Sequence, residues 1–222
     1  MFYRYGNPCP AELVIVSAKL HGETRLIAVR KDQLPKGALT RETVIDETRR
    51  SFKLVLDGVE IGADQMLPGR DFKAIERAAL LLSAAEIAGG IAGVLNVTVD
   101  YLKTRKQFGK LIGSYQALKH PMVEVLIGLE RSRSYLYNAT TLIARGELAE
   151  SDMALRMSKA SGSEAFAFAG DRAVQFHGGF GFTWDCDAQL YLRRALWLQY
   201  QWGDERFHRQ ILAPLLLDGV QA

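Results

Sequence analysis

The spacing of apolar residues changes near residue 70 and divides the chain into two parts. Before that point, apolar and polar residues alternate in three segments, residues 13–20, 24–31 and 51–61. Alternation of this kind, bounded by turn-forming residues, predicts β-strands. The first two segments flank residues 21–23 and predict a β-hairpin, and the third follows a longer loop.

From residue 71 onward, apolar residues recur at i, i+3, i+4 and i+7, which is typical of amphipathic helices. The first such stretch, residues 71–107, predicts one long helix that tolerates Gly89 and Gly90 in its middle. The same spacing predicts two more long helices and two short ones, at residues 114–145, 151–178, 185–198 and 204–217.

Capping and breaking residues place the ends of these helices. Pro121 lies either near the start of the second helix or at a kink in it. Ser151 is a candidate N-cap for the third helix, and Gly178 and Gly179 predict where that helix stops.

Together these elements predict an α+β chain that is mostly α. A partial β-domain of about three strands, residues 1–68, precedes an antiparallel helical bundle, residues 69–222. Because sheets average about five or six strands, the β part reads as incomplete.

Composition narrows the classes of function. The net charge of +3 comes from 28 basic and 25 acidic residues spread along the chain, so no basic stripe predicts nucleic-acid binding. No uninterrupted run of about 18 apolar residues and no signal-peptide pattern occur, which predicts a cytoplasmic protein without a membrane span. Cys9 and Cys186 read as ordinary thiols, and no metal site is predicted because the histidines are scattered, at His21, His120, His177 and His208.

Three segments carry a resemblance to a known family. They are YLKTRKQFGKLIGSYQALKH (101–120), QFHGGFGFTWDCDAQLYLRRA (175–195) and the strand region AELVIVSA with DETRRSFKLVLDGVEI. Together they resemble the acyl-CoA dehydrogenase family, whose Arg-x-x-Phe-Gly segment and Gln-x-x-Gly-Gly-x-Gly loop match at Arg105 and Gln175. The resemblance covers essentially the whole chain, which corresponds to the family's C-terminal portion: the end of the middle β-domain and the helical bundle.

The resemblance implies FAD-dependent α,β-dehydrogenation of an acyl-CoA thioester, in fatty acid or sterol side-chain oxidation. It also implies a homo- or hetero-oligomer, a dimer or tetramer, that shares FAD across subunits and passes electrons to a partner. The implied cofactor-binding residues, which would meet the adenine-diphosphate half of FAD, are Arg105, Gln107, Phe108, Gln116, Gln175, Gly178 and Gly179.

Residue chemistry supports several of these roles. Bare backbone at Gly178 and Gly179 lets N–H groups approach a pyrophosphate, and a guanidinium at Arg105 can pair with it bidentately. By the resemblance, Phe108 packs against the cofactor and Gln116 hydrogen-bonds to it. The alternatives are a plain helix stop at the glycines, a solvated charge at Arg105 and a core ring at Phe108.

The catalytic base is not evident. Abstraction of the α-proton needs a carboxylate, and family spacing places it at Trp202 or near Ala79, neither of which can accept a proton. The nearby carboxylates are better explained as helix-start or solvated charges, so no base is assigned; they are Glu76, Glu86, Asp204 and Glu205. The paired Arg193 and Arg194 could face acyl-CoA phosphates, although a structural role is favoured.

Three functions follow from these observations. The chain is an acyl-CoA dehydrogenase or a part of one, a catalytically silent partner subunit of a heteromeric enzyme, or a helical interaction module without cofactor. Trp202 in the base position favours the second over the first, and the intact Arg105 and Gln175 segments argue against the third.

Overall fold

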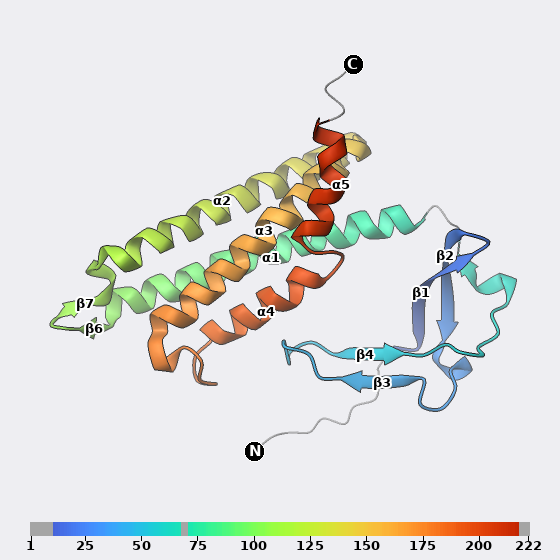
Figure 1. Cartoon of the computed structure of the whole chain (residues 1–222), viewed down its shortest axis with the longest axis horizontal. Coiled ribbons are helices and arrows are strands. Elements are labelled where there is room, and N and C mark those ends of the chain that lie inside the picture. The colour runs from blue at the N-terminus through green and yellow to red at the C-terminus, as the bar shows by residue number, and fades with distance from the viewer. Residues whose placement is uncertain (1–10, 68–70, 218–222) are drawn as a thin grey trace. The chain divides into compact units, whose positions relative to one another are not determined.

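The computed structural model describes residues 11–67 and 71–217, and Cys9 lies outside them. The chain divides into two compact units, Met1–Glu76 and Arg77–Ala222, which are described separately. The first unit holds the larger strands, and the second holds the helical bundle (Figure 1).

The predicted hairpin is confirmed. Strand β1 (Leu13–Leu20) pairs antiparallel with β2 (Glu23–Arg30) over eight residue pairs. Its turn residues, His21 and Gly22, both have positive φ, at 50° and 85°, which is the geometry that matches the twist of two-residue hairpins. A short strand, β5 (Met66–Leu67), pairs with the other edge of β2, so these three strands form one sheet.

The third predicted strand is shorter than expected and has a partner that the pattern missed. Strand β4 (Ser51–Leu54) ends well before residue 61, since the chain turns at Gly58, where φ is 75°. It pairs antiparallel with β3 (Leu39–Glu42), which lies in the segment predicted to be a loop. Strand β3 reads LTRE and carries a single apolar residue, so it shows no alternation to detect.

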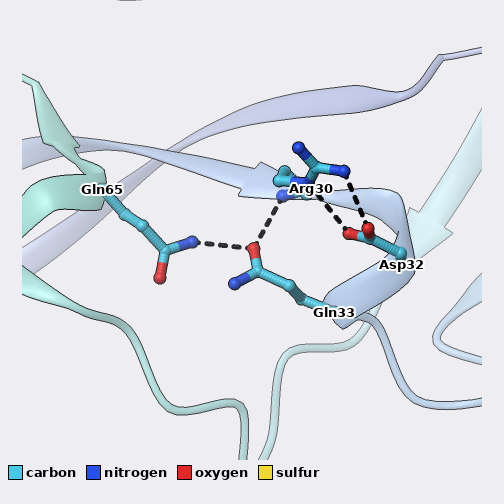
Figure 2. A network of polar contacts seen from close by, with 4 residues as sticks. All are labelled: Arg30, Asp32, Gln33 and Gln65. Atoms are coloured by element: carbon cyan, nitrogen blue, oxygen red, sulfur yellow. Dashed lines mark hydrogen bonds and ion pairs between the residues drawn. The ribbon is translucent and has the colours of Figure 1, made fainter.

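A small polar network ties the end of β2 to the segment before β5 (Figure 2). Gln33 Oε1 accepts hydrogen bonds from the backbone N–H of Arg30, at 3.0 Å, and from Nε2 of Gln65, at 2.8 Å. The guanidinium of Arg30 pairs with both carboxylate oxygens of Asp32. The Gln33–Gln65 contact joins residues that are 32 positions apart in the sequence.

The described part of the second unit contains five helices, the first of which begins a few residues before the unit does. They are α1 (Asp71–Thr104), α2 (Gln116–Arg145), α3 (Leu148–His177), α4 (Ala188–Tyr200) and α5 (Glu205–Leu217). Helix α3 packs against α2, α4 and α5, and in Figure 1 it runs through the middle of the bundle. The predicted mostly helical α+β fold class is confirmed.

Several predicted helix ends differ from the structure. The first helix ends at Thr104 rather than 107, because residues 106–111 form a small hairpin. Ser151 is not the N-cap of α3: it lies inside the helix, and its hydroxyl donates to the Leu148 carbonyl at 2.8 Å. The break between α2 and α3 comes instead from Gly146, whose φ of 78° ends α2.

Helix α1 is long and apolar enough to cross a membrane by length and composition, with a mean hydropathy of 1.9 over its most apolar window. Its residues Leu80, Ile87 and Ile91, however, are at most 1% exposed and lie in the bundle core. Core helices pass the same composition test, so the absence of a membrane span stays a prediction.

Small residues let the helices approach α3 closely. A methyl group at Gly90 of α1 would overlap the ring of Phe166 on α3. A methyl group at Gly170 of α3 would lie 2.8 Å from the Leu192 backbone on α4, and one at Gly128 of α2 would touch Ala165 on α3. Each of these glycines therefore marks a contact between neighbouring helices.

A buried lysine joins α3 to the end of α4. Lys159 is fully buried, and its Nζ donates to Ser163 Oγ at 3.1 Å and to the carbonyls of Leu198 and Gln199 at 2.9 and 3.0 Å. These carbonyls belong to the C-terminal turn of α4, where a cation is favoured. Burial lowers the pKa of Lys159 to about 8, and the Glu205 and Asp204 charges oppose that decrease.

His208 of α5 is buried beside this cation. Its Nδ1 lies 3.4 Å from Nη1 of Arg156. Burial lowers the pKa of His208 to about 4, and the positive charges of Lys159 and Arg156 act in the same direction. The imidazole is therefore neutral at physiological pH.

The neighbouring glycines of α1 provide a test of this packing. Gly90→Ala should lower the free energy of unfolding by about 1–3 kcal/mol, because the new methyl overlaps Phe166. Gly89→Ala is the matched control: nothing lies within 4 Å of its added methyl, so it should raise that free energy by about 0.5–1 kcal/mol. Urea denaturation followed by circular dichroism measures both, and equal effects would contradict the packing.

The buried imidazole predicts acid sensitivity. Between pH 6.5 and about 4, unfolded His208 takes up a proton and folded His208 does not, so the free energy of unfolding should fall as pH decreases through this window. The slope from this residue is at most about 1.4 kcal/mol per pH unit. Urea denaturation at pH 7, 6 and 5 should show a shallower slope in His208→Gln than in the wild type. The exposed His120→Gln should keep the wild-type slope.

Candidate functional site

A pocket of about 860 Å³ lies where the ends of α1 and α3 meet the start of α2. Six of the seven predicted cofactor-binding residues line it: Arg105, Gln107, Phe108, Gln175, Gly178 and Gly179. Gln116 is the exception. It is the exposed first residue of α2, and its neighbours Tyr115 and Ala117 line the pocket in its place.

One wall is a tight hairpin that continues from α1. Strands β6 (Lys106–Gln107) and β7 (Lys110–Leu111) pair across Phe108 and Gly109, whose φ values are 54° and 75°. A positive φ is uncommon for a bulky residue. Phe108 is also 89% exposed, which excludes the alternative of a core ring and leaves the side chain available for a contact outside the unit.

Backbone hydrogen bonds fix Arg105 at the base of this hairpin. Its N–H donates to the Tyr101 carbonyl at 2.9 Å, which extends the last turn of α1 by one bond. Its carbonyl accepts from the Ile112 N–H, also at 2.9 Å, which closes the hairpin. The backbone of Arg105 is therefore held at both ends, while its side chain is exposed.

The facing wall is the turn that ends α3. Gly178 has φ of 62°, a conformation that favours glycine, and its N–H donates to the Gln175 carbonyl. This is the helix stop anticipated from the two glycines. An added methyl at Gly178 or Gly179 would meet nothing within 4 Å, so the backbone here also faces open space.

The charge of the described lining residues suits an anion. Among them, Arg105 carries a positive charge and no carboxylate is present. The remaining surface is largely aromatic and aliphatic, with Tyr101, Ile112, Tyr115, Leu118, Phe176, His177 and Phe180 as its main contributors. One cation beside bare backbone and apolar walls fits a ligand that joins a phosphate to a flat ring, and the volume lies within the range of small-molecule sites.

Sequence reasoning missed five aromatic members of this lining: Tyr101, Tyr115, Phe176, His177 and Phe180. Tyr101 precedes Arg105 by one helical turn, Tyr115 adjoins Gln116, and His177 lies between Gln175 and the glycines. The closeness of these three residues to predicted residues in the sequence was a signal that could have identified them. None was distinguishable from a core aromatic without the tertiary arrangement.

The paired arginines of α4 have partners within the chain. Arg194 forms an ion pair with Glu86 of α1. The Arg193 guanidinium lies 4.9 Å from the centre of the Trp184 ring. Both contacts support the structural role favoured for these arginines.

The positions expected to hold a catalytic base offer none. Trp202 has φ of 60° and is 44% exposed in the turn between α4 and α5. Asp204 caps α5 by accepting from the Phe207 N–H at 2.8 Å, and Glu205 accepts from Gln199 Nε2 at 3.2 Å. Neither carboxylate, nor Glu86 in its ion pair, lines the pocket.

Comparison with known proteins places this arrangement in a family. Residues 74–217 match the family described as acyl-CoA dehydrogenase, C-terminal domain. The acyl-CoA dehydrogenase IpdE2 of Mycolicibacterium smegmatis is 36% identical over 151 residues, which are 68% of this chain and 44% of that relative. The chain therefore spans less than half the length of this curated relative.

Solved structures agree. The Tcur3481–Tcur3483 steroid ACAD (G363A variant) superposes with a TM-score of 0.85 at 25% identity, covering 96% of this chain and 57% of that one. The ChsE4–ChsE5 complex of Mycobacterium tuberculosis has the same fold, with a TM-score of 0.82 at 22% identity over 93% of this chain and 56% of that one. This chain belongs to the acyl-CoA dehydrogenase family, as its C-terminal helical domain with adjoining strands.

Proposed function

We propose that this chain forms the C-terminal part of an FAD-dependent acyl-CoA dehydrogenase and that its pocket holds the adenosine diphosphate half of FAD. The observation that carries the proposal is the convergence of Arg105 and the 175–179 turn, 70 residues apart in sequence, on one pocket. The flavin half of the cofactor would be held by a neighbouring subunit, so the functional protein would be an oligomer.

The residues of the chain divide the work of binding. Arg105 pairs with the diphosphate, and a planar guanidinium does so with two parallel hydrogen bonds. Gly178 and Gly179 let the backbone come close to the same phosphates. Phe108, exposed at the hairpin tip, covers the cofactor or the neighbouring subunit that brings it.

FAD, when bound, would supply the acceptor for a hydride from Cβ of an acyl-CoA thioester, and a carboxylate supplied from outside the described pocket lining would take the Cα proton. The thioester loses two electrons and two hydrogens, and electrons leave the assembly through an electron-transfer partner. The expected setting is cytoplasmic oxidation of a fatty acid or a sterol side chain.

A second candidate is a catalytically silent subunit of a heteromeric dehydrogenase. Trp202 stands where the family places a glutamate, and Asp204 and Glu205 are engaged in hydrogen bonds beside it. Such a subunit lends Arg105 and the 175–179 turn to the FAD of an active paralogue. Two structural neighbours carry two-part names, Tcur3481–Tcur3483 and the ChsE4–ChsE5 complex, and these names support the proposal of heteromeric assembly.

Flavin content tests the shared cofactor. Purified alone, this chain should show no stoichiometric flavin absorbance in the visible range, because its pocket holds only one half of FAD. Co-expression with the paralogue that completes the site should give a yellow complex. A homomer saturated with FAD would contradict the sharing of the cofactor.

Arg105 tests the diphosphate assignment. Titration of ADP into the ¹⁵N-labelled chain should shift the amide signals of Gly178 and Gly179. Arg105→Ala should weaken ADP binding about 10- to 100-fold, the loss expected for charge-assisted hydrogen bonds. Arg105→Lys should recover only part of it.

Lys103→Ala is the matched control, since it removes a nearby exposed charge from a residue outside the pocket lining and should leave ADP affinity within about twofold. Thermal melting should be unchanged in all three variants because both side chains are exposed. Equal ADP affinity in Arg105→Ala and the wild type would rule out the assigned role, and adenosine, which lacks phosphate, should bind both alike.

A further inference from the structure

Two aromatic rings join the walls of the pocket. The ring of Tyr101, in the last turn of α1, stacks on the ring of His177, the last residue of α3, with centroids 4.2 Å apart and planes 25° from parallel. The two residues are 76 positions apart in sequence. Each adjoins one wall: Tyr101 receives the Arg105 N–H on its carbonyl, and His177 precedes Gly178.

The imidazole is itself held in place. Its Nδ1 lies 2.7 Å from the Ala173 carbonyl one turn earlier in α3, so Nδ1 carries the proton and donates. The ring is 5% exposed, and the Phe180 ring beyond the glycines lies 6.5 Å from it. His177 therefore presents a fixed surface to Tyr101 rather than a mobile side chain.

The stack lies nearer the C-terminal end of α1 than the contact of Gly90 with α3 does. Gly90, where α1 meets the ring of Phe166, precedes Tyr101 by eleven residues, or about 16 Å along the helix. The end of α1 and the hairpin that follows it thus depend on contacts near Tyr101 for their place relative to α3.

We propose that Tyr101 and His177 are positioning residues: their stack sets the distance between Arg105 and the Gln175–Gly179 turn, and so determines whether both can reach one diphosphate. The ligand in this inference rests on the proposed function, but the coupling between the two walls does not. The alternative is that the stack only contributes to the stability of the core. In that case, any substitution that lowers the free energy of unfolding equally would have the same effect on the two walls.

Hydrogen–deuterium exchange separates these possibilities without a ligand. Tyr101→Leu keeps an apolar side chain but removes the ring. Amides of residues 178–181, on the opposite wall, should then exchange about tenfold faster or more, as should those of residues 105–112. Tyr101→Phe retains the stack and should restore wild-type exchange at both walls.

Leu142→Ala is the matched control. Leu142 packs on the separate cluster around Leu155, so its truncation destabilises the bundle without touching the pocket. It should leave exchange at residues 178–181 unchanged. If Tyr101→Leu does not fold, His177→Ala removes the other ring, and residues 105–112, the hairpin segment that follows α1, become the remote reporter. Equal exchange in the ring-deleted variant and Leu142→Ala overturns the proposal.

ADP titration completes the test. Tyr101→Leu should weaken ADP binding about tenfold, although it leaves Arg105 intact, and Leu142→Ala should not weaken it. If Tyr101→Leu exchanges faster but binds ADP with unchanged affinity, the stack contributes only to packing, and its positioning role is overturned. If the wild-type chain binds no ADP, the proposed function fails, and the exchange data alone then decide whether the rings couple the two walls.

Discussion

The close approach of neighbouring helices to α3 is the constraint on which the helical unit depends. Most of the buried face of α3 is built from Ala, Ser and Gly, which leave room for the side chains and backbone of α1, α2 and α4. Phe166 fills the space left by Gly90, and the Leu192 backbone fills the space beside Gly170. Because packed interiors adapt poorly to added volume, these contacts fix how far each helix can slide along α3.

The position of the pocket follows from that packing. Helix α3 ends at His177, and α1 ends one residue before Arg105, so helices held side by side bring their C-terminal ends together. The hairpin after α1 and the glycine turn after α3 then face one another across a space that neither could form alone. A pocket built at helix ends combines a rigid scaffold with exposed backbone.

At the C-terminal end of α4, charged side chains rather than small residues hold the neighbouring elements together. Lys159 holds the last turn of α4 through two carbonyls, and Asp204 caps α5 by accepting a hydrogen bond from the Phe207 N–H. The turn between them carries Trp202 rather than a proton acceptor.

Much of this organisation was predictable from the sequence. Periodicity identified the five helices and the β-hairpin, because burying one face of a helix or a strand imposes a repeat that short-range reading detects. The Arg105 and Gln175 segments identified the family because they resemble two of its sequence motifs. The polar strand β3, by contrast, has no such repeat and is defined only by its pairing with β4.

Other features were decided by tertiary contacts. Ser151 has the side chain of an N-cap, yet Gly146 breaks the chain earlier and leaves the serine inside α3. Lys159 reads as a surface charge, and only the neighbouring end of α4 supplies the carbonyls that make its burial tolerable. Gln116 was predicted to bind the cofactor but does not line the pocket, whereas Tyr101 and His177 line it and were not predicted. The packing of α1 on α3 determines which side chains meet between segments about 70 residues apart. Local periodicity therefore determined the elements, and the close packing around α3, which no local pattern encodes, determined the site.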